Sequence, residues 1–182
     1  MTDFSYLNVD NAYKLINQKV TKTPLVTNDY INNLLEAEIY FKLENLQNTG
    51  SFKLRGATHK ITKLIENVKD SGVVAYSSGN HAQAVAYASM INSISAKIIM
   101  PKTAPQIKIE NTKNYGAEVI LYDTYFQNRE EIGIEIQKKD NRALIKPYDD
   151  EDIIAGQGTA AIEIANDLEE QSIEPDLYLC CC

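Results

Sequence analysis

The chain has 182 residues, of which 44% are hydrophobic, and a net charge of −7. This length allows one large or two small domains with a buried core. An acidic chain without a basic stripe lacks the main driving force for binding nucleic acid, so nucleic acid is excluded as a partner. No run of 18 apolar residues predicts a membrane span and no secretory signal is recognisable, so we expect a cytoplasmic protein.

In the first part of the chain, apolar residues at helical spacing predict three helices, and one alternating segment predicts a strand. Pro24 separates the first two helices because proline breaks a helical pattern. The expected helices are 10–20, 28–35 and 53–68, and the expected strand is 38–43.

From residue 73 onward, expected strands and helices alternate. The strands are 73–76, 96–100, 118–122 and 143–145, and the helices are 81–90, 105–114, 125–138 and 159–168. Such alternation predicts an α/β fold in which helices cover both faces of a parallel sheet. Ligands usually bind at the carboxyl ends of the strands of such sheets, and Ser77-Ser78-Gly79-Asn80 follows a strand at such an end.

The segment Thr49-Gly50-Ser51-Phe52-Lys53-Leu54-Arg55-Gly56-Ala57 contains a lysine between two apolar residues. A lysine that condenses with an aldehyde needs a neutral, partly desolvated amine, which makes Lys53 a candidate nucleophile. Gly50 permits an unusual backbone angle before the lysine, Ser51 is a candidate helix cap, and Gly56 allows close packing of the helix.

The segment Ser77-Ser78-Gly79-Asn80-His81 combines turn residues with the start of a helix. Free N–H groups at a helix N-terminus attract an anion such as a carboxylate. The alternative is an ordinary helix capped by Ser or Asn. Only two histidines occur, which argues against a histidine-based metal site, and His59 is expected to be an ordinary helix-face residue. The three cysteines, Cys180 to Cys182, are adjacent and lack the spacing of a zinc site, so we expect small buried apolar residues.

Together these segments resemble the fold-type II pyridoxal-phosphate enzymes, specifically the threonine dehydratase and serine racemase family. The resemblance extends in order through Lys22-Thr23-Pro24-Leu25, Phe41-Lys42-Leu43-Glu44, Met100-Pro101, Tyr115-Gly116-Ala117 and Ile154-Ala155-Gly156-Gln157-Gly158-Thr159. It implies a tryptophan synthase β-like α/β fold with two domains. Residues 1–71 and 150–182 would belong to the large domain, and 72–149 would form the small mobile domain.

In this family a strand corresponding to 177–182 leads into a tetraglycine loop that holds the cofactor phosphate, and the sequence stops before that loop. The resemblance therefore implies an N-terminal fragment with an incomplete large domain, inactive on its own. It also implies a homodimer when the protein is full length, with a small amino acid as substrate.

The resemblance implies a role for each motif residue. Lys53 would bind pyridoxal phosphate as an imine and then act as the base that removes the Cα proton, and Phe52 would pack near the cofactor. Asn80 would hydrogen-bond the phenolic oxygen of the cofactor, while the amides around Ser77, Asn80 and His81 would receive the substrate carboxylate.

Two further residues bear on the activity. Ser78 occupies the position at which racemases of this family carry a proton-returning serine. Arg129 resembles an arginine that binds the substrate carboxylate in serine racemases; alternatively, it pairs with neighbouring carboxylates on a solvated helix face.

The resemblance favours dehydration of serine or threonine to ammonia and a 2-oxo acid. The alternatives are a serine or hydroxyaspartate racemase, bifunctional or not, and a non-catalytic amino-acid-binding domain if the truncation is natural.

Overall fold

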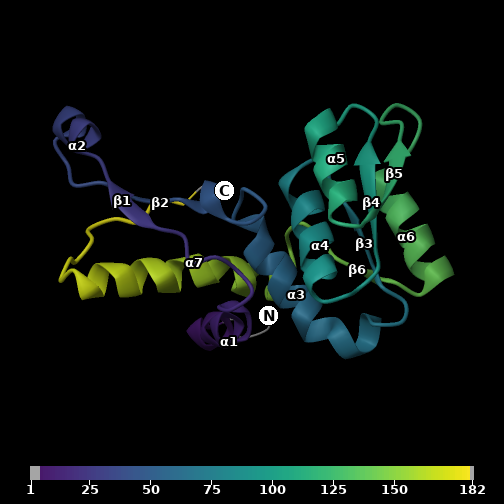
Figure 1. The fold of residues 1–182 in the computed structure, drawn as a ribbon, viewed down its shortest axis with the longest axis horizontal. Helices are drawn as coiled ribbons and strands as arrows, with labels where there is room; N and C mark the ends of the chain where they lie inside the picture. The colour runs from purple at the N-terminus through teal and green to yellow at the C-terminus, as the bar shows by residue number, and fades with distance from the viewer. Residues whose placement is uncertain (1–4, 181–182) are drawn as a thin grey trace.

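The computed structural model describes residues 5–180, which form two lobes joined by helices α3 and α7 (Figure 1). One lobe contains a four-stranded parallel sheet in the order β5-β4-β3-β6. Its strands are β3 (Val73–Tyr76), β4 (Ala96–Pro101), β5 (Glu118–Tyr122) and β6 (Ala143–Leu144). The expected parallel sheet is therefore confirmed, and β3 and β5 have the predicted bounds.

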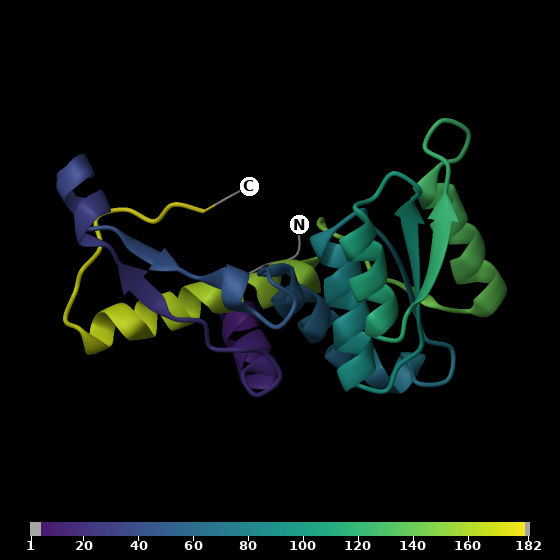
Figure 2. The same cartoon turned by 45° about the horizontal axis from the view of Figure 1, so that its top comes forward.

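Helices cover both faces of this sheet (Figures 1 and 2). Alternate residues of a strand point to opposite faces, so Val73 and Ala75 join the core cluster that includes α4 (Asn80–Ile91). Val74 and Tyr76 face the other way and pack with α6 (Arg129–Asp140). Helix α5 (Gln106–Asn114) lies on the side of α4 (Figure 1).

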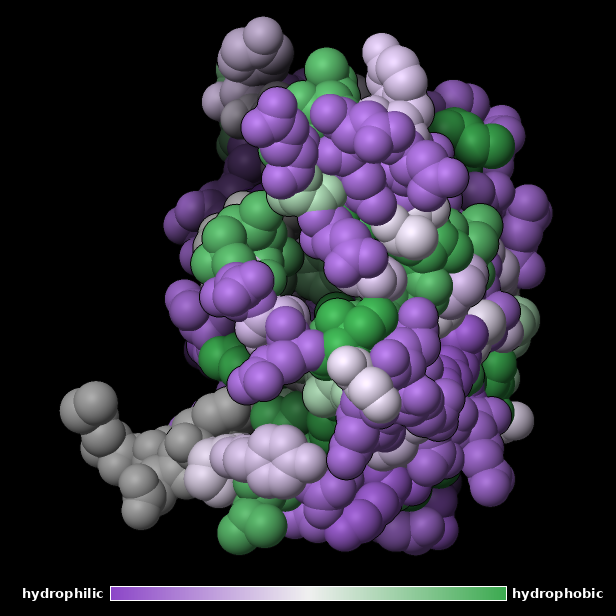
Figure 3. Space-filling model, turned by 90° about the vertical axis from the view of Figure 1, so that its left-hand side faces the viewer, coloured by the Kyte–Doolittle hydropathy of each residue, from purple (hydrophilic) through white to green (hydrophobic). Residues whose placement is uncertain are grey.

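The second lobe is built on α1 (Tyr6–Ile16) and the long helix α7 (Glu151–Glu170). Strands β1 (Leu25–Thr27) and β2 (Tyr40–Lys42) pair antiparallel, and α2 (Asp29–Leu35) connects them. A short 3-10 turn, η1 (Glu44–Leu46), follows β2. Figure 3 views this end of the molecule and shows apolar surface interspersed with polar side chains around a hollow.

Helix α3 (Lys53–Val68) lies between the two lobes and crosses α7 at very short distance. A Cβ atom added to Gly56 would lie 2.8 Å from the Ile153 carbonyl oxygen, and one added to Gly156 would lie 2.6 Å from the Cα of Gly56. Neither position has room for a side chain. The expectation that Gly56 permits close helix packing is confirmed.

Beside this crossing, buried charges connect the segments around α3. Both terminal nitrogens of Arg55 donate to Glu163, at 2.8 Å each, and Nη2 also donates to Glu44 at 2.7 Å. Lys42 pairs with Glu163 at 2.9 Å. Arg55 is fully buried. The network links η1, α3 and α7, and thereby fixes the start of α3.

Several sequence predictions were wrong. The helix expected at 125–138 begins only at Arg129, because the Asn128 side chain caps it by accepting a hydrogen bond from the Glu130 amide. The helix expected at 159–168 spans Glu151–Glu170, because Asp150 caps it by accepting from two amides. The first helix spans Tyr6–Ile16, so it begins and ends four residues before the expected range 10–20, and β1 was not predicted.

Two expectations for the C-terminal residues were also wrong. Residues 171–180 turn back from the end of α7 toward the middle of the molecule (Figures 1 and 2), and 177–180 form no strand. Cys180 is exposed rather than buried, while Cys181 and Cys182 lie outside the described residues. No helix within residues 5–180 is long and apolar enough to cross a membrane.

Candidate active site

Lys53 is the first residue of α3, and its side chain is half-buried. Gly50, three residues earlier, has φ of +73°, so the expected unusual backbone angle is confirmed. Burial lowers the pKa of the Lys53 amine below its usual value, because desolvation disfavours the charged form. The amine therefore has a larger neutral fraction at a given pH than an exposed lysine.

The Lys53 amine donates to the carbonyl oxygen of Pro147 at 3.0 Å. It also lies 5.2 Å from the ring centroid of Phe52, which is partly exposed. The expectation that Ser51 caps α3 was wrong. Its hydroxyl is buried and has no hydrogen-bond partner among the described residues. An unsatisfied hydroxyl two residues before the lysine is available to a ligand.

His81 is buried, and its Nε2 lies 3.1 Å from the carbonyl oxygen of Ile145. Burial lowers the pKa of His81 to about 4, and the nearby charge of Lys53 acts in the same direction, against the bond to Ile145. The ring is thus neutral at pH 7, with its hydrogen on Nε2 because a carbonyl can only accept. Nδ1 has no partner.

Both contacts converge on one segment. Lys53 in α3 and His81 in α4 hold the carbonyl oxygens of Pro147 and Ile145, which directly follow β6. The structure thus brings together two motifs that are 28 positions apart in sequence. Neither Ile145 nor Pro147 was predicted, because backbone carbonyls carry no side-chain signature.

The loop between β3 and α4 leads into the N-terminus of α4, and two of its amides have partners. Ser77 donates its amide to the Ile99 carbonyl at 3.1 Å, and the Gly79 amide donates to the Ser77 hydroxyl at 3.2 Å. No side chain caps α4, so the alternative of an ordinary capped helix is not observed. The first amides of α4 remain at the positive helix end, where an anion is stabilised.

The side chains of Ser78 and Asn80 are exposed on this loop. Asn80 Oδ1 accepts from the Lys108 amine of α5 at 2.9 Å, which leaves the two N–H groups of its amide available. Lys108 was not predicted from the sequence, since no motif connects it to Asn80.

Arg129 is the first residue of α6, and its guanidinium carbon lies 5.3 Å from the ring centroid of Tyr76. Within residues 5–180 it forms no ion pair with a carboxylate. The alternative of a surface pair with its neighbours is therefore not observed. His59 is buried against α7, with Nδ1 2.7 Å from the Asp152 carbonyl oxygen, and takes no part in this region.

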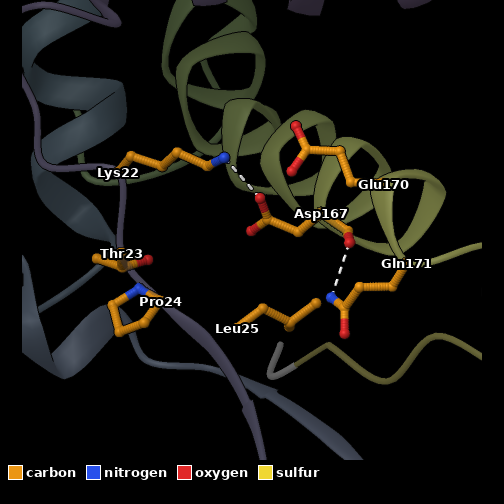
Figure 4. A pocket seen from close by; sticks show the side chains of 7 residues that line it. All are labelled: Lys22, Thr23, Pro24, Leu25, Asp167, Glu170 and Gln171. Carbon is orange, nitrogen blue, oxygen red and sulfur yellow. Dashed lines mark hydrogen bonds and ion pairs between the residues drawn. The ribbon is translucent and has the colours of Figure 1, made fainter.

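Two cavities lie away from Lys53. One of about 390 Å³ lies between α7 and the segment before β1, where Lys22 and Asp167 pair at 2.6 Å (Figure 4). Another of about 490 Å³ adjoins Lys19 and Tyr87. Neither is lined by a predicted site residue. Within residues 5–180, no three His, Cys, Asp or Glu side chains are grouped to hold a metal ion.

The chain matches one protein family over most of its length. Residues 16–182 match the family described as "Pyridoxal-phosphate dependent enzyme". The chain belongs to this family. Pyridoxal phosphate is the cofactor of the family, and the fold-type II resemblance inferred from the motifs is confirmed.

Named relatives include both lyases and racemases. The chain is 44% identical to L-threo-3-hydroxyaspartate ammonia-lyase of Saccharomyces cerevisiae, over 90% of this chain and 50% of the relative. It is 43% identical to serine racemase of Schizosaccharomyces pombe, over 97% of this chain and 54% of the relative. The crystal structure of serine racemase from Dictyostelium discoideum superposes with a TM-score of 0.84 at 40% identity, covering 90% of this chain and 53% of that one.

The chain thus spans about half the length of the curated relatives that it matches. The described residues nevertheless fit the cofactor. Lys53 offers an amine with a lowered pKa for an aldehyde, Asn80 offers free N–H groups, and the buried hydroxyl of Ser51 lacks a partner. These are donors suited to an aromatic aldehyde that carries several oxygen atoms.

Proposed function

We propose that the protein is a pyridoxal-phosphate-dependent ammonia-lyase that dehydrates a β-hydroxy amino acid, serine or threonine, to a 2-oxo acid and ammonia. The observation that carries this proposal is the half-buried Lys53 amine with its lowered pKa. Its carbonyl partner lies in the same segment as that of His81, which belongs to the first turn of α4, a helix start without a side-chain cap. A general base can remove the Cα proton of an amino acid, and a helix N-terminus can bind its carboxylate.

When bound, the cofactor supplies an electron sink for the charge left by loss of the Cα proton. Lys53 removes that proton as general base. Departure of the β-hydroxyl completes the loss of water, and the resulting enamine tautomerises and hydrolyses to the 2-oxo acid and ammonia. His81 needs no proton-transfer role, because its ring is buried and neutral.

The remaining residues bind and orient. Asn80 donates to the phenolic oxygen of the cofactor, and Phe52 packs beside it. The amides around Ser77, Asn80 and His81, together with Arg129, receive the substrate carboxylate. We further infer that 72–149 is the small mobile domain and that 1–71 and 150–182 belong to the large domain. In support, the whole four-stranded sheet lies within 73–144.

A second candidate is racemisation of serine or hydroxyaspartate, alone or beside elimination. It is favoured by the exposed hydroxyl of Ser78 on the same loop as Asn80, which can return a proton from the face opposite Lys53. The names of the similar proteins include both reactions. Cytoplasmic location and homodimeric assembly are parts of the same proposal.

The experiment is product analysis on the longest protein encoded by the reading frame that contains these residues. L-serine, L-threonine and L-threo-3-hydroxyaspartate are supplied with pyridoxal phosphate, and ammonia, 2-oxo acid and the enantiomers are quantified, with Lys53→Ala as control. Oxo acid and ammonia in equal amounts support the lyase, and a D-product supports the racemase. Saturable amino-acid binding with neither product identifies a non-catalytic binding domain and contradicts both.

A further inference from the structure

Arg129 occupies an unfavourable place for a cation. It is half-buried in the first turn of α6, where the helix dipole repels positive charge. Glu130 and Glu131, which suit that turn, are both exposed to solvent. No carboxylate within residues 5–180 pairs with the guanidinium. A half-buried guanidinium without a carboxylate partner keeps N–H donors that can bind an anion.

The ring of Tyr76 is what holds this guanidinium, with 5.3 Å between the guanidinium carbon and the ring centroid. Tyr76 is only 7% exposed, because it packs between the sheet and α6. A Cβ added to Gly133 would lie 3.2 Å from Tyr76 Cδ1, so the ring touches α6 at that position. Arg129 and Gly133 are four residues apart, and therefore lie on the same helix face, above the ring.

The position of Tyr76 in the chain connects it to the substrate loop. Tyr76 is the last residue of β3, and Ser77 begins the loop that leads to the uncapped start of α4. A side chain fixed at the end of β3 therefore places the cation at the edge of the sheet where the loop amides are presented.

We propose that Tyr76 is a positioning residue for substrate recognition: its ring holds the Arg129 guanidinium beside the 77–81 loop, so that both bind one carboxylate. The inference rests on the proposed function, in which Arg129 and the loop receive that carboxylate. The aromatic face, rather than the phenolic hydroxyl, is the part that acts, since cation–π attraction comes from the ring.

The test is titration of the ¹⁵N-labelled chain with succinate, without cofactor, followed through the amides of residues 77–82 and the Arg129 Nε–H. Tyr76→Leu should raise the dissociation constant for succinate by about threefold to tenfold, which corresponds to the free energy of one cation–π contact. Tyr76→Phe, which keeps the ring, should stay within about twofold of the parent chain. Well-dispersed spectra establish that each variant is folded.

A double-mutant cycle distinguishes positioning from a general structural effect. In the Arg129→Gln chain, Tyr76→Leu should cause no further loss of succinate affinity. An equal loss with and without Arg129, or a loss in Tyr76→Phe as large as in Tyr76→Leu, would overturn the inference while leaving the carboxylate site intact. No saturable binding to the parent chain would overturn the carboxylate site itself, and the inference with it.

Discussion

Lys53 and Pro147, 94 positions apart in the chain, are joined by a 3.0 Å hydrogen bond from the lysine amine to the proline carbonyl. The bond connects the first turn of α3 to the segment that leaves the four-stranded sheet. His81 contacts the carbonyl of Ile145 in the same segment, so α3 and α4 both contact the residues that follow β6.

The crossing of α3 and α7 depends on glycine. Replacing Gly56 with alanine would place a methyl group 2.8 Å from the Ile153 carbonyl oxygen, and should lower the free energy of unfolding by about 1–3 kcal/mol. Asn67→Ala, at an exposed position of the same helix, is the control and should change little. Urea denaturation measures both. Equal stability of the two variants would contradict the close contact.

The buried ion network should be sensitive to loss of one partner. Glu163→Gln removes the carboxylate that binds both Arg55 and Lys42, and should lower the free energy of unfolding by about 3–5 kcal/mol, because buried charges are left uncompensated. Glu66→Gln removes the exposed pair with Lys69 and should cost less than about 1 kcal/mol. Similar losses in the two variants, measured by urea denaturation, would argue against a buried network.

His81 should make the protein less stable in acid. Its pKa falls from 6.5 to about 4 on folding, so the unfolded chain binds the proton more readily. The stability from the neutral ring is complete above pH 6.5 and is lost progressively as the pH falls toward 4, by roughly 3 kcal/mol in all. His81→Gln should lack this component. Unfolding free energies measured between pH 7.5 and 4.5 test it, and parallel pH profiles for parent and variant would refute it.

Ser78→Ala separates the two proposed reactions. If Ser78 returns a proton from the face opposite Lys53, racemisation should fall by about 100-fold or more while elimination is largely retained, since elimination needs only the lysine. Chiral analysis and oxo-acid release, measured together in the longest encoded protein, give both rates. An equal fall in both would show that the substitution only damages the carboxylate loop.

The sequence predicted the central elements well. Strands β3 and β5 and helix α3 have the expected bounds. Strand β3 is buried at every position and reads as a continuous apolar run, β5 is a short run rich in β-branched and apolar residues, and α3 has strong helical periodicity. The expected helix 125–138 starts too early because Tyr125 and Phe126 are apolar, yet both are 88% exposed and lie before α6. Aromatic residues in loops give the same signal as residues of a helix face.

The candidate site was predictable only where side-chain motifs define it. Lys53 and the 77–81 loop were identified from their residue types and spacing. The carbonyl oxygens of Ile145 and Pro147, the Lys108 amine and the Tyr76 ring were not, because those contacts arise from tertiary packing between segments far apart in sequence.

Lys53 is the lysine that we propose binds the cofactor. Burial lowers the pKa of the Lys53 amine and so raises its neutral fraction, and it should therefore form an imine before an exposed, ion-paired lysine such as Lys69 does. The 182-residue chain is incubated with limiting pyridoxal phosphate, reduced with borohydride and mapped by peptide mass spectrometry, with Lys53→Arg as control. We expect a phosphopyridoxyl group chiefly on Lys53, and its loss in the control. Labelling of Lys53 no greater than that of Lys69 would contradict it.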